Sequence, residues 1–187
     1  ENLLYGNPDA TEEQINEAIR LVSAESVISR LEKGLDTDVG EGGDLLSTGE
    51  KQLISFARAI LADPRILVLD EATAMLDPAG RREVLDTVHR LNRQRGITVV
   101  HITHHMSEAE DADRVIVMND GVVAMDGTPR DIFSRVEELR SLGLAAPDTV
   151  ELLHRLNGHG MSLPLTAITV DECARAIFQA LHGAEGK

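Results

Sequence analysis

The chain has 187 residues, of which 42% are hydrophobic, so it can bury one good core and a small appendage. Its 18 Lys and Arg residues stand against 32 Asp and Glu residues, and the formal net charge of −14 argues against general binding to nucleic acid or to an anionic membrane surface. No apolar run approaches the roughly 20 residues that span a bilayer, and the single Cys173 excludes an internal disulfide. We therefore expect a soluble protein of a reducing cytoplasm, without direct membrane insertion.

The segment 7–34 has a helical pattern. Thr11 and Gln14 have the spacing of a capping box, in which each side chain bonds the backbone N–H of the other residue. Apolar residues then recur at helical spacing, and a second apolar set follows them: Ile15, Ala18, Ile19, Val22, Val27, Ile28 and Leu31. These residues predict a helical unit that precedes the sheet.

Glycines at positions 40, 42 and 43 interrupt regular structure, and the segment 46–52 then opens a helix that runs towards Leu61. Ser47 and Glu50 again have capping-box spacing, with Gly49 between them. A glycine-bearing helix start presents backbone N–H groups and the positive end of the helix dipole, which suits a phosphate group. An ordinary capped helix without a ligand is the alternative interpretation.

Residues 66–69 are an apolar run that ends in Asp70 and Glu71. Such a run predicts a strand buried on both faces of a parallel sheet, with both acids at its carboxyl end, where open α/β sheets bind ligands. One carboxylate there can hold Mg²⁺, and a second beside it can orient or deprotonate a water molecule. The alternative is a strand that ends in solvated acids.

Three histidines, His101, His104 and His105, lie at and after the apolar strand predicted over 97–102. A cluster of this kind can suggest zinc. However, His104 and His105 are adjacent and are expected to point apart, and Cys173 is far away in the sequence. We favour a polar contact from His104 to phosphate, with His101 and His105 as packing or surface residues.

The remaining segments predict a hairpin and short helices. Residues 114–119 and 122–126 read as strands joined by a tight turn at Asp120-Gly121, and a short helix with Ile132 and Phe133 inward follows. Beyond Val136 the pattern predicts amphipathic helices over 136–142, 149–156 and 171–181. A packed helical extension with no function of its own is one interpretation of this region.

The order and spacing of these segments resemble the ATP-binding-cassette (ABC) ATPases, over at least residues 1–135. By this resemblance, 46–50 is the signature motif, 66–71 holds the Walker B strand and the catalytic carboxylate, 74–77 is the D-loop and His104 is the switch histidine. Two departures from the family pattern stand out. Thr48 replaces the usual glycine and Glu50 replaces the usual glutamine.

The resemblance implies an α/β fold with a P-loop NTPase-like parallel sheet, a helical subdomain and a small helical C-terminal region. The implied parts are a helical signature subdomain and connecting loop over 1–46, an ATPase core over 47–135 and the helical C-terminal region over 136–187. In importer ATPases of this family the corresponding tail helps two ATPase subunits to associate, and the resemblance implies the same role here.

Two kinds of cassette are represented in the sequence. Exporter-type cassettes are similar to segments 1–6, 37–43 and 57–64. The ATPase subunits of energy-coupling-factor vitamin and metal importers are similar to segments 74–78, 80–84, 112–118, 127–130 and 169–173. A natural mosaic, an engineered chimera and a misassembled gene would all produce this combination.

The resemblance also implies catalytic roles. Asp70 would hold Mg²⁺, Glu71 would act on the attacking water, and His104 would contact the γ-phosphate of ATP. The whole protein would couple ATP binding and hydrolysis to transport, at the cytoplasmic face of the cell membrane, with transmembrane transporter subunits as partners.

The same resemblance implies contacts between two ATPase subunits, identical or different. Ser47, Thr48, Gly49 and Glu50 would contact the nucleotide held by the second subunit, and Asp77 would couple the two sites.

The sequence contains no Gly-x-x-x-x-Gly-Lys-Ser/Thr loop, the Walker A element whose backbone and lysine hold a triphosphate. The chain also begins with Glu1 and not with Met, so we expect a fragment or a processed form. On this basis we expect the chain alone to be inactive. A catalytically silent interaction module, or a truncated remnant of an ABC ATPase, is the alternative function.

Overall fold

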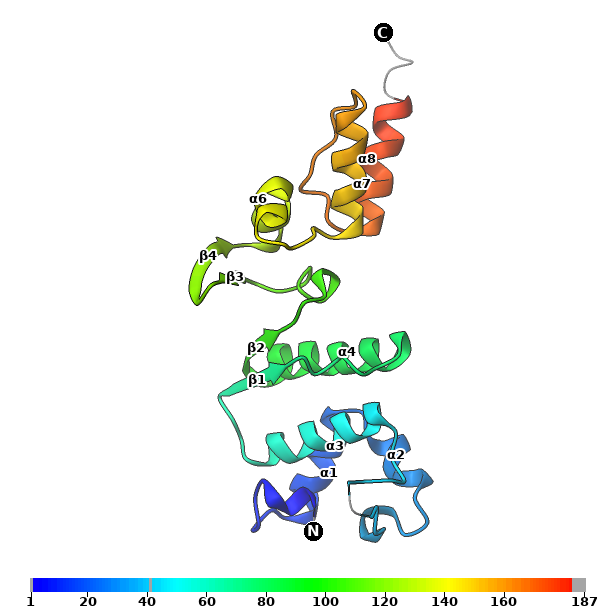
Figure 1. Ribbon diagram of the computed structural model, residues 1–187. Coiled ribbons are helices and arrows are strands. Elements are labelled where there is room, and N and C mark those ends of the chain that lie inside the picture. The colour runs from blue at the N-terminus through cyan, green and yellow to red at the C-terminus, as the bar shows by residue number, and fades with distance from the viewer. Residues whose placement is uncertain (1, 41, 183–187) are drawn as a thin grey trace. The chain divides into compact units, whose positions relative to one another are not determined.

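The computed structural model describes residues 2–40 and 42–182. It divides into two compact units, Glu1–Ile102 and Thr103–Lys187, which are taken in turn (Figure 1). The outermost residues of the predicted ranges 1–46 and 136–187, together with Glu41, lie outside the described residues. Within the described part of the chain, no helix is both long enough and apolar enough to cross a membrane.

The first unit combines helices with a small parallel sheet. Its helices are η1 (Leu3–Tyr5), α1 (Glu12–Leu21), α2 (Glu25–Arg30), η2 (Gly34–Asp36), α3 (Thr48–Leu61) and α4 (Pro78–Arg95), and its strands are β1 (Ile66–Asp70) and β2 (Thr98–Ile102).

Helix α1 begins at the predicted capping box. The Gln14 N–H donates to Thr11 Oγ1 at 3.3 Å, and the Thr11 N–H donates to Gln14 Oε1 at 2.8 Å. The apolar face predicted for this helix is confirmed, since Ala18 and Ile19 are buried in the core that α1 shares with α3 and α4. The capping box therefore fixes where the first helical unit starts.

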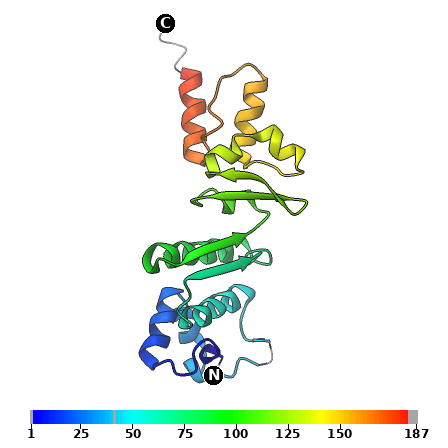
Figure 2. The same ribbon diagram turned by 90° about the vertical axis from the view of Figure 1, so that its left-hand side faces the viewer.

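Strand β1 pairs in parallel with β2 (Figure 2). In this register Asp70 lies opposite Ile102. The prediction that β1 is buried on both faces is wrong. Leu69 is buried in the core beneath the sheet, whereas Ile66 and Val68 are 60% and 61% exposed. The reason is that α3 and α4 cover one face of this two-stranded sheet, while no described element of the first unit covers the other.

Helix α4 was not predicted, although it carries clear boundary signals. Asp77 caps its amino end, Pro78 occupies its first turn, and Gly96 ends it with a φ of 65°, a left-handed conformation that glycine adopts at little cost. Arg90 donates to Leu21 O at 3.3 Å and to the Ser23 hydroxyl, and Arg95 pairs with Glu17 at 2.6 Å. These contacts attach α4 to α1 and to the turn that follows it.

The second unit contains η3 (Met106–Glu108), the strands β3 (Val115–Asn119) and β4 (Val122–Gly127), and the helices α5 (Pro129–Phe133), α6 (Val136–Ser141), α7 (Asp148–Gly158) and α8 (Val170–His182). The predicted hairpin is confirmed, with Asp120 and Gly121 both at positive φ in its turn. Ile132 and Phe133 are buried as predicted. The three helices predicted beyond Val136 are present as well.

An ion pair joins α5 to α8 in the second unit. The guanidinium of Arg130 donates to both carboxylate oxygens of Glu172, at 2.7 and 3.0 Å, and also to Thr166 O at 2.6 Å. These hydrogen bonds lower the pKa of Glu172 to about 2, against a smaller opposing effect of burial. Because both side chains are partly exposed, solvent screening limits the contribution of the pair to stability.

The Glu172 pair predicts a pH dependence of stability. A carboxyl whose pKa is lowered by folding stabilises the folded state above its ordinary value of 4.5, and this contribution disappears as the pH falls towards about 2. In thermal unfolding near neutral pH, Glu172→Gln should have a lower melting temperature than the parent chain. This difference in melting temperature should become smaller in acid. Asp171→Asn removes the same charge one residue earlier, from an exposed side chain, and is the control. A constant difference at all pH values would refute the assignment.

Gly6 predicts a strong steric effect in the first unit. A Cβ at this position would overlap the carbonyl oxygen of Arg58 in α3, and backbone cannot move away as a flexible side chain can. Gly6→Ala should therefore destabilise the chain by about 1–3 kcal/mol, the usual range for overpacking, in urea unfolding followed by circular dichroism. Gly158→Ala, whose Cβ would meet open space, should be neutral or slightly stabilising. Equal stability of Gly6→Ala and the parent would contradict this packing.

Candidate nucleotide site

The predicted acids lie at the carboxyl end of β1. Asp70 is exposed and is the last residue of the strand. Glu71 follows at a φ of 46°, and its N–H donates to Ile102 O at 3.0 Å, one bond beyond the paired strands. A left-handed conformation costs a residue other than glycine roughly 1–2 kcal/mol, and strain of this kind collects at functional sites. The backbone therefore turns sharply at Glu71, directly after the strand that ends with Asp70.

Buried residues hold the turn that follows. Ala72 and Thr73 are buried, the Ala74 N–H donates to Glu71 O at 3.0 Å, and the Leu76 N–H donates to Thr73 O at 3.1 Å. The turn carrying Glu71 is therefore anchored on the core side and is not a loose loop. This anchoring limits how far the carboxylate of Glu71 can move.

The predicted signature motif forms the first turn of α3. Ser47 is the N-cap, and its hydroxyl accepts from the Glu50 N–H at 3.4 Å. The Ser47 N–H in turn donates to Glu50 Oε2 at 2.8 Å, which completes the predicted capping box. Thr48 and Gly49 lie between them as the first two helical residues. The side chain of Glu50 therefore folds back over the helix start.

Arg30 is a residue of this site that the sequence did not indicate. Its guanidinium, from α2, pairs with Glu50 Oε1. Burial alone would raise the pKa of Glu50, but the bonds from Ser47 and from Arg30 outweigh it and lower that pKa. Glu50 thus carries its charge next to a cation, which offsets the repulsion expected from an acid near phosphate.

The predicted signature turn and the predicted D-loop are neighbours in the first unit. A Cβ on Gly49 would lie 3.8 Å from the Cδ2 atom of Leu76. Asp77, the next residue, caps α4 by accepting from the Gly80 N–H at 2.7 Å. Leu76 therefore lies beside Gly49 in the first unit, next to the start of α3.

His104 belongs to the second unit, where it is exposed. The prediction that His104 and His105 point apart is wrong, because their ring centroids are 4.2 Å apart at an interplanar angle of 38°. His104 and His105 follow the end of β2 and are not in an extended strand, so their side chains need not point to opposite sides.

The donor set at the strand end suits Mg²⁺ bound with phosphate. Among the described residues there is no group of three or more His, Cys, Asp or Glu residues that could hold a metal ion together. Mg²⁺ keeps several waters and is usually bound by one or two carboxylates plus phosphate oxygens, so a single exposed Asp70 fits such an ion. The metal would then depend on the nucleotide for its other ligands.

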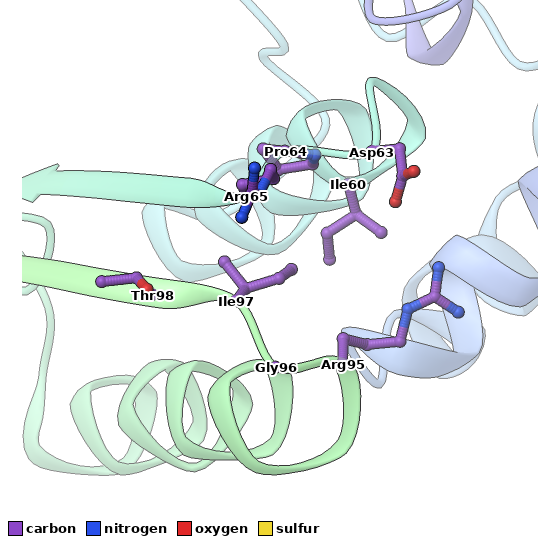
Figure 3. A pocket seen from close by; sticks show the side chains of 8 residues that line it. All are labelled: Ile60, Asp63, Pro64, Arg65, Arg95, Gly96, Ile97 and Thr98. Carbon is purple, nitrogen blue, oxygen red and sulfur yellow. The ribbon is translucent and has the colours of Figure 1, made fainter.

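A hollow of about 290 Å³ lies at the opposite ends of the strands (Figure 3). It is lined by Ile60, Asp63, Pro64, Arg65, Arg95, Gly96, Ile97 and Thr98. Arg65 directly precedes β1 and Thr98 begins β2, so this hollow is at the amino ends, away from Asp70. Its lining mixes an acid with two arginines, and α/β sheets bind ligands at the other edge.

Comparison with known proteins shows which class of protein the chain resembles. Residues 2–74 match the model of the ABC transporter family. A solved structure described as a bacterial Atm1-family ABC exporter with ATP bound superposes with a TM-score of 0.63 at 34% identity, covering 72% of this chain and 23% of that chain. These matches confirm both the resemblance to ABC ATPases and the P-loop NTPase-like α/β fold.

Curated relatives narrow the resemblance. The energy-coupling factor transporter ATP-binding protein EcfA1 of Caldanaerobacter subterraneus is 50% identical over 133 residues, 71% of this chain and 48% of that protein. EcfA1 of Symbiobacterium thermophilum is 52% identical over 135 residues, 72% and 47% of the two chains, and EcfA2 of the same organism is 43% identical over 163 residues, 86% and 56%. The chain thus spans about half the length of these relatives. Relatives named as energy-coupling factor transporter ATP-binding proteins and a structure described as an ABC exporter thus both match the chain, and the sequence motifs had indicated both resemblances.

The contribution of Asp77 as the N-cap of α4 can be measured through stability alone. Asp77→Ala removes the acceptor for the Gly80 N–H and should destabilise the chain by about 1 kcal/mol, the usual loss for an N-cap. Asp77→Asn keeps an acceptor oxygen and should retain most of the stability. Thermal unfolding of the two variants provides the measurement. If both variants melted with the parent chain, the cap would contribute nothing.

Proposed function

We propose that this chain is part of the nucleotide-binding subunit of an ABC-type membrane transporter, of the energy-coupling-factor kind. The whole protein binds ATP with Mg²⁺, pairs with a second ATPase subunit, and couples hydrolysis to transport by transmembrane subunits at the cytoplasmic face of the membrane. The relatives' names and the family match support this assignment.

The observation that carries the proposal is the placement of Asp70 and Glu71 at the carboxyl end of a parallel strand. Asp70 is exposed and takes Mg²⁺, while Glu71, turned by its left-handed backbone and fixed by Ile102, acts on the attacking water. Two adjacent acids, one at the end of the strand and one in the turn after it, can serve these two roles without competing for one ligand.

The remaining roles follow from the motifs. The N-terminal turn of α3 faces the nucleotide of the second subunit with Ser47, Thr48, Gly49 and Glu50. Asp77, in contact range of that turn through Leu76, couples the two sites. His104 contacts the γ-phosphate.

A catalytically silent interaction module is the second candidate function. It is supported by Thr48, which stands where the family usually has glycine, because a β-branched residue restricts the backbone of the predicted signature turn. The two candidates differ in whether the full-length protein turns over ATP.

Glu71→Gln tests the proposed chemistry in the full-length protein. Glutamine keeps the shape of the side chain but cannot take a proton from water, so turnover should fall by roughly 10²- to 10⁴-fold. ATP binding should persist, since loss of a negative charge near the phosphates reduces repulsion. Steady-state ATPase assays and ATP titrations measure the two effects. Near-normal turnover would show that Glu71 is not the base.

Two further variants complete the design. Asp70→Asn should raise the Mg²⁺ concentration needed for activity, because a neutral amide holds the cation less well. Glu83→Gln makes the same chemical change as Glu71→Gln at an exposed position on α4, and should leave turnover unchanged. An unchanged Mg²⁺ requirement in Asp70→Asn would remove Asp70 from the metal site.

A further inference from the structure

One buried acid has no part in the roles proposed above. Glu108, the last residue of η3, is only 6% exposed, and in the part of the chain that the structure describes no other Asp or Glu is buried. A buried carboxylate is costly unless it is bonded, so its contacts carry structural information.

Glu108 closes a small ring of hydrogen bonds around the proposed switch histidine. Its Oε2 atom accepts from the Thr103 hydroxyl at 2.6 Å. The Thr103 oxygen accepts from the His105 N–H at 3.0 Å, and the Glu108 N–H donates to His105 O at 3.0 Å. His104 lies in the chain between Thr103 and His105, both of which take part in these hydrogen bonds. The side chain of His104 itself is exposed.

The direction of these bonds depends on Glu108. A hydroxyl has one proton to donate and two lone pairs with which to accept. Because the single proton of Thr103 is directed to a carboxylate, a strong acceptor, a lone pair of the same oxygen is left facing the His105 N–H. Without the carboxylate the hydroxyl could rotate, and the bond that fixes the peptide after His104 would weaken.

We propose that Glu108 is a positioning residue for His104, acting through the Thr103 hydroxyl and the His105 amide. The proposal rests on the proposed contact of His104 with the γ-phosphate. It assigns Glu108 no contact with nucleotide. Its effect is to hold the backbone on both sides of His104, so that the imidazole meets the phosphate without a search over loop conformations.

The first test needs no catalysis. Amide hydrogen exchange at His105, followed by NMR in the 187-residue chain, should be faster in Glu108→Leu and in Thr103→Val than in the parent chain. Thr103→Ser keeps the hydroxyl and should restore slow exchange. Glu110→Gln removes a charge from the same segment without touching Thr103, and should leave exchange at His105 unchanged. Unchanged exchange in Thr103→Val would overturn the proposal.

The second test uses turnover of the full-length protein. Glu108→Leu and Thr103→Val should lower kcat by about 10- to 100-fold, the range for a misplaced catalytic group, with little change in KM. Thr103→Ser should keep most of the parent kcat. If Thr103→Ser and Thr103→Val have the same melting temperature, a difference in their kcat values cannot come from a general loss of stability. If Glu108→Leu does not fold, the Thr103→Val and Thr103→Ser pair decides alone.

His104→Ala separates the proposed role of His104 from that of Glu108. If His104→Ala leaves kcat unchanged, the proposed role of His104 fails, whatever Glu108 does. If His104→Ala lowers kcat while Glu108→Leu and Thr103→Val change neither kcat nor His105 exchange, the role of Glu108 fails and that of His104 stands.

Discussion

The parallel pairing of β1 with β2 is the constraint on which the first unit depends. It brings Asp70 level with Ile102, and the Glu71 N–H extends the ladder by one more bond to Ile102 O. That last bond is made by a residue in a left-handed conformation, so the chain turns away at once. The acids are thus presented by the end of a hydrogen-bonded sheet, and the packing of Leu69 on the helices below keeps that end in place.

Charge is balanced locally in a chain that is strongly acidic as a whole. The net charge of −14 would oppose an anionic ligand at long range. At the start of α3, however, Glu50 is engaged by Ser47 and by Arg30, and the helix start contributes its own positive potential. The local field at the turn that is proposed to face phosphate is therefore set by neighbours within a few ångströms more than by the total charge.

Sequence reasoning succeeded where the signal is local. The capping boxes at Thr11 and Ser47 and the turn at Asp120-Gly121 each depend on a few adjacent residues, and all three have the predicted form. The acids after β1 could be placed because an apolar run followed by charge marks a strand end. The order of the motifs then gave the family resemblance.

What the sequence could not give depends on contacts between distant segments. Arg30 lies twenty residues from Glu50 and has no pattern that marks it as a partner. Burial of both faces of β1 was inferred from hydrophobicity alone, yet it requires covering elements that the described residues of the first unit do not supply. The left-handed backbone of Glu71 and the ring closed by Glu108 likewise arise from tertiary geometry.

The central claim is that nucleotide and metal meet the chain at the carboxyl edge of the sheet. Mn²⁺ can replace Mg²⁺ with ATP and broadens the NMR signals of nearby nuclei. In the full-length protein, addition of Mn²⁺ and ATP should broaden the amide signals of Asp70 and Glu71 much more strongly than those of Arg65 and Thr98, at the opposite edge. Broadening centred on Arg65 and Thr98, or none at Asp70 and Glu71, would contradict the account.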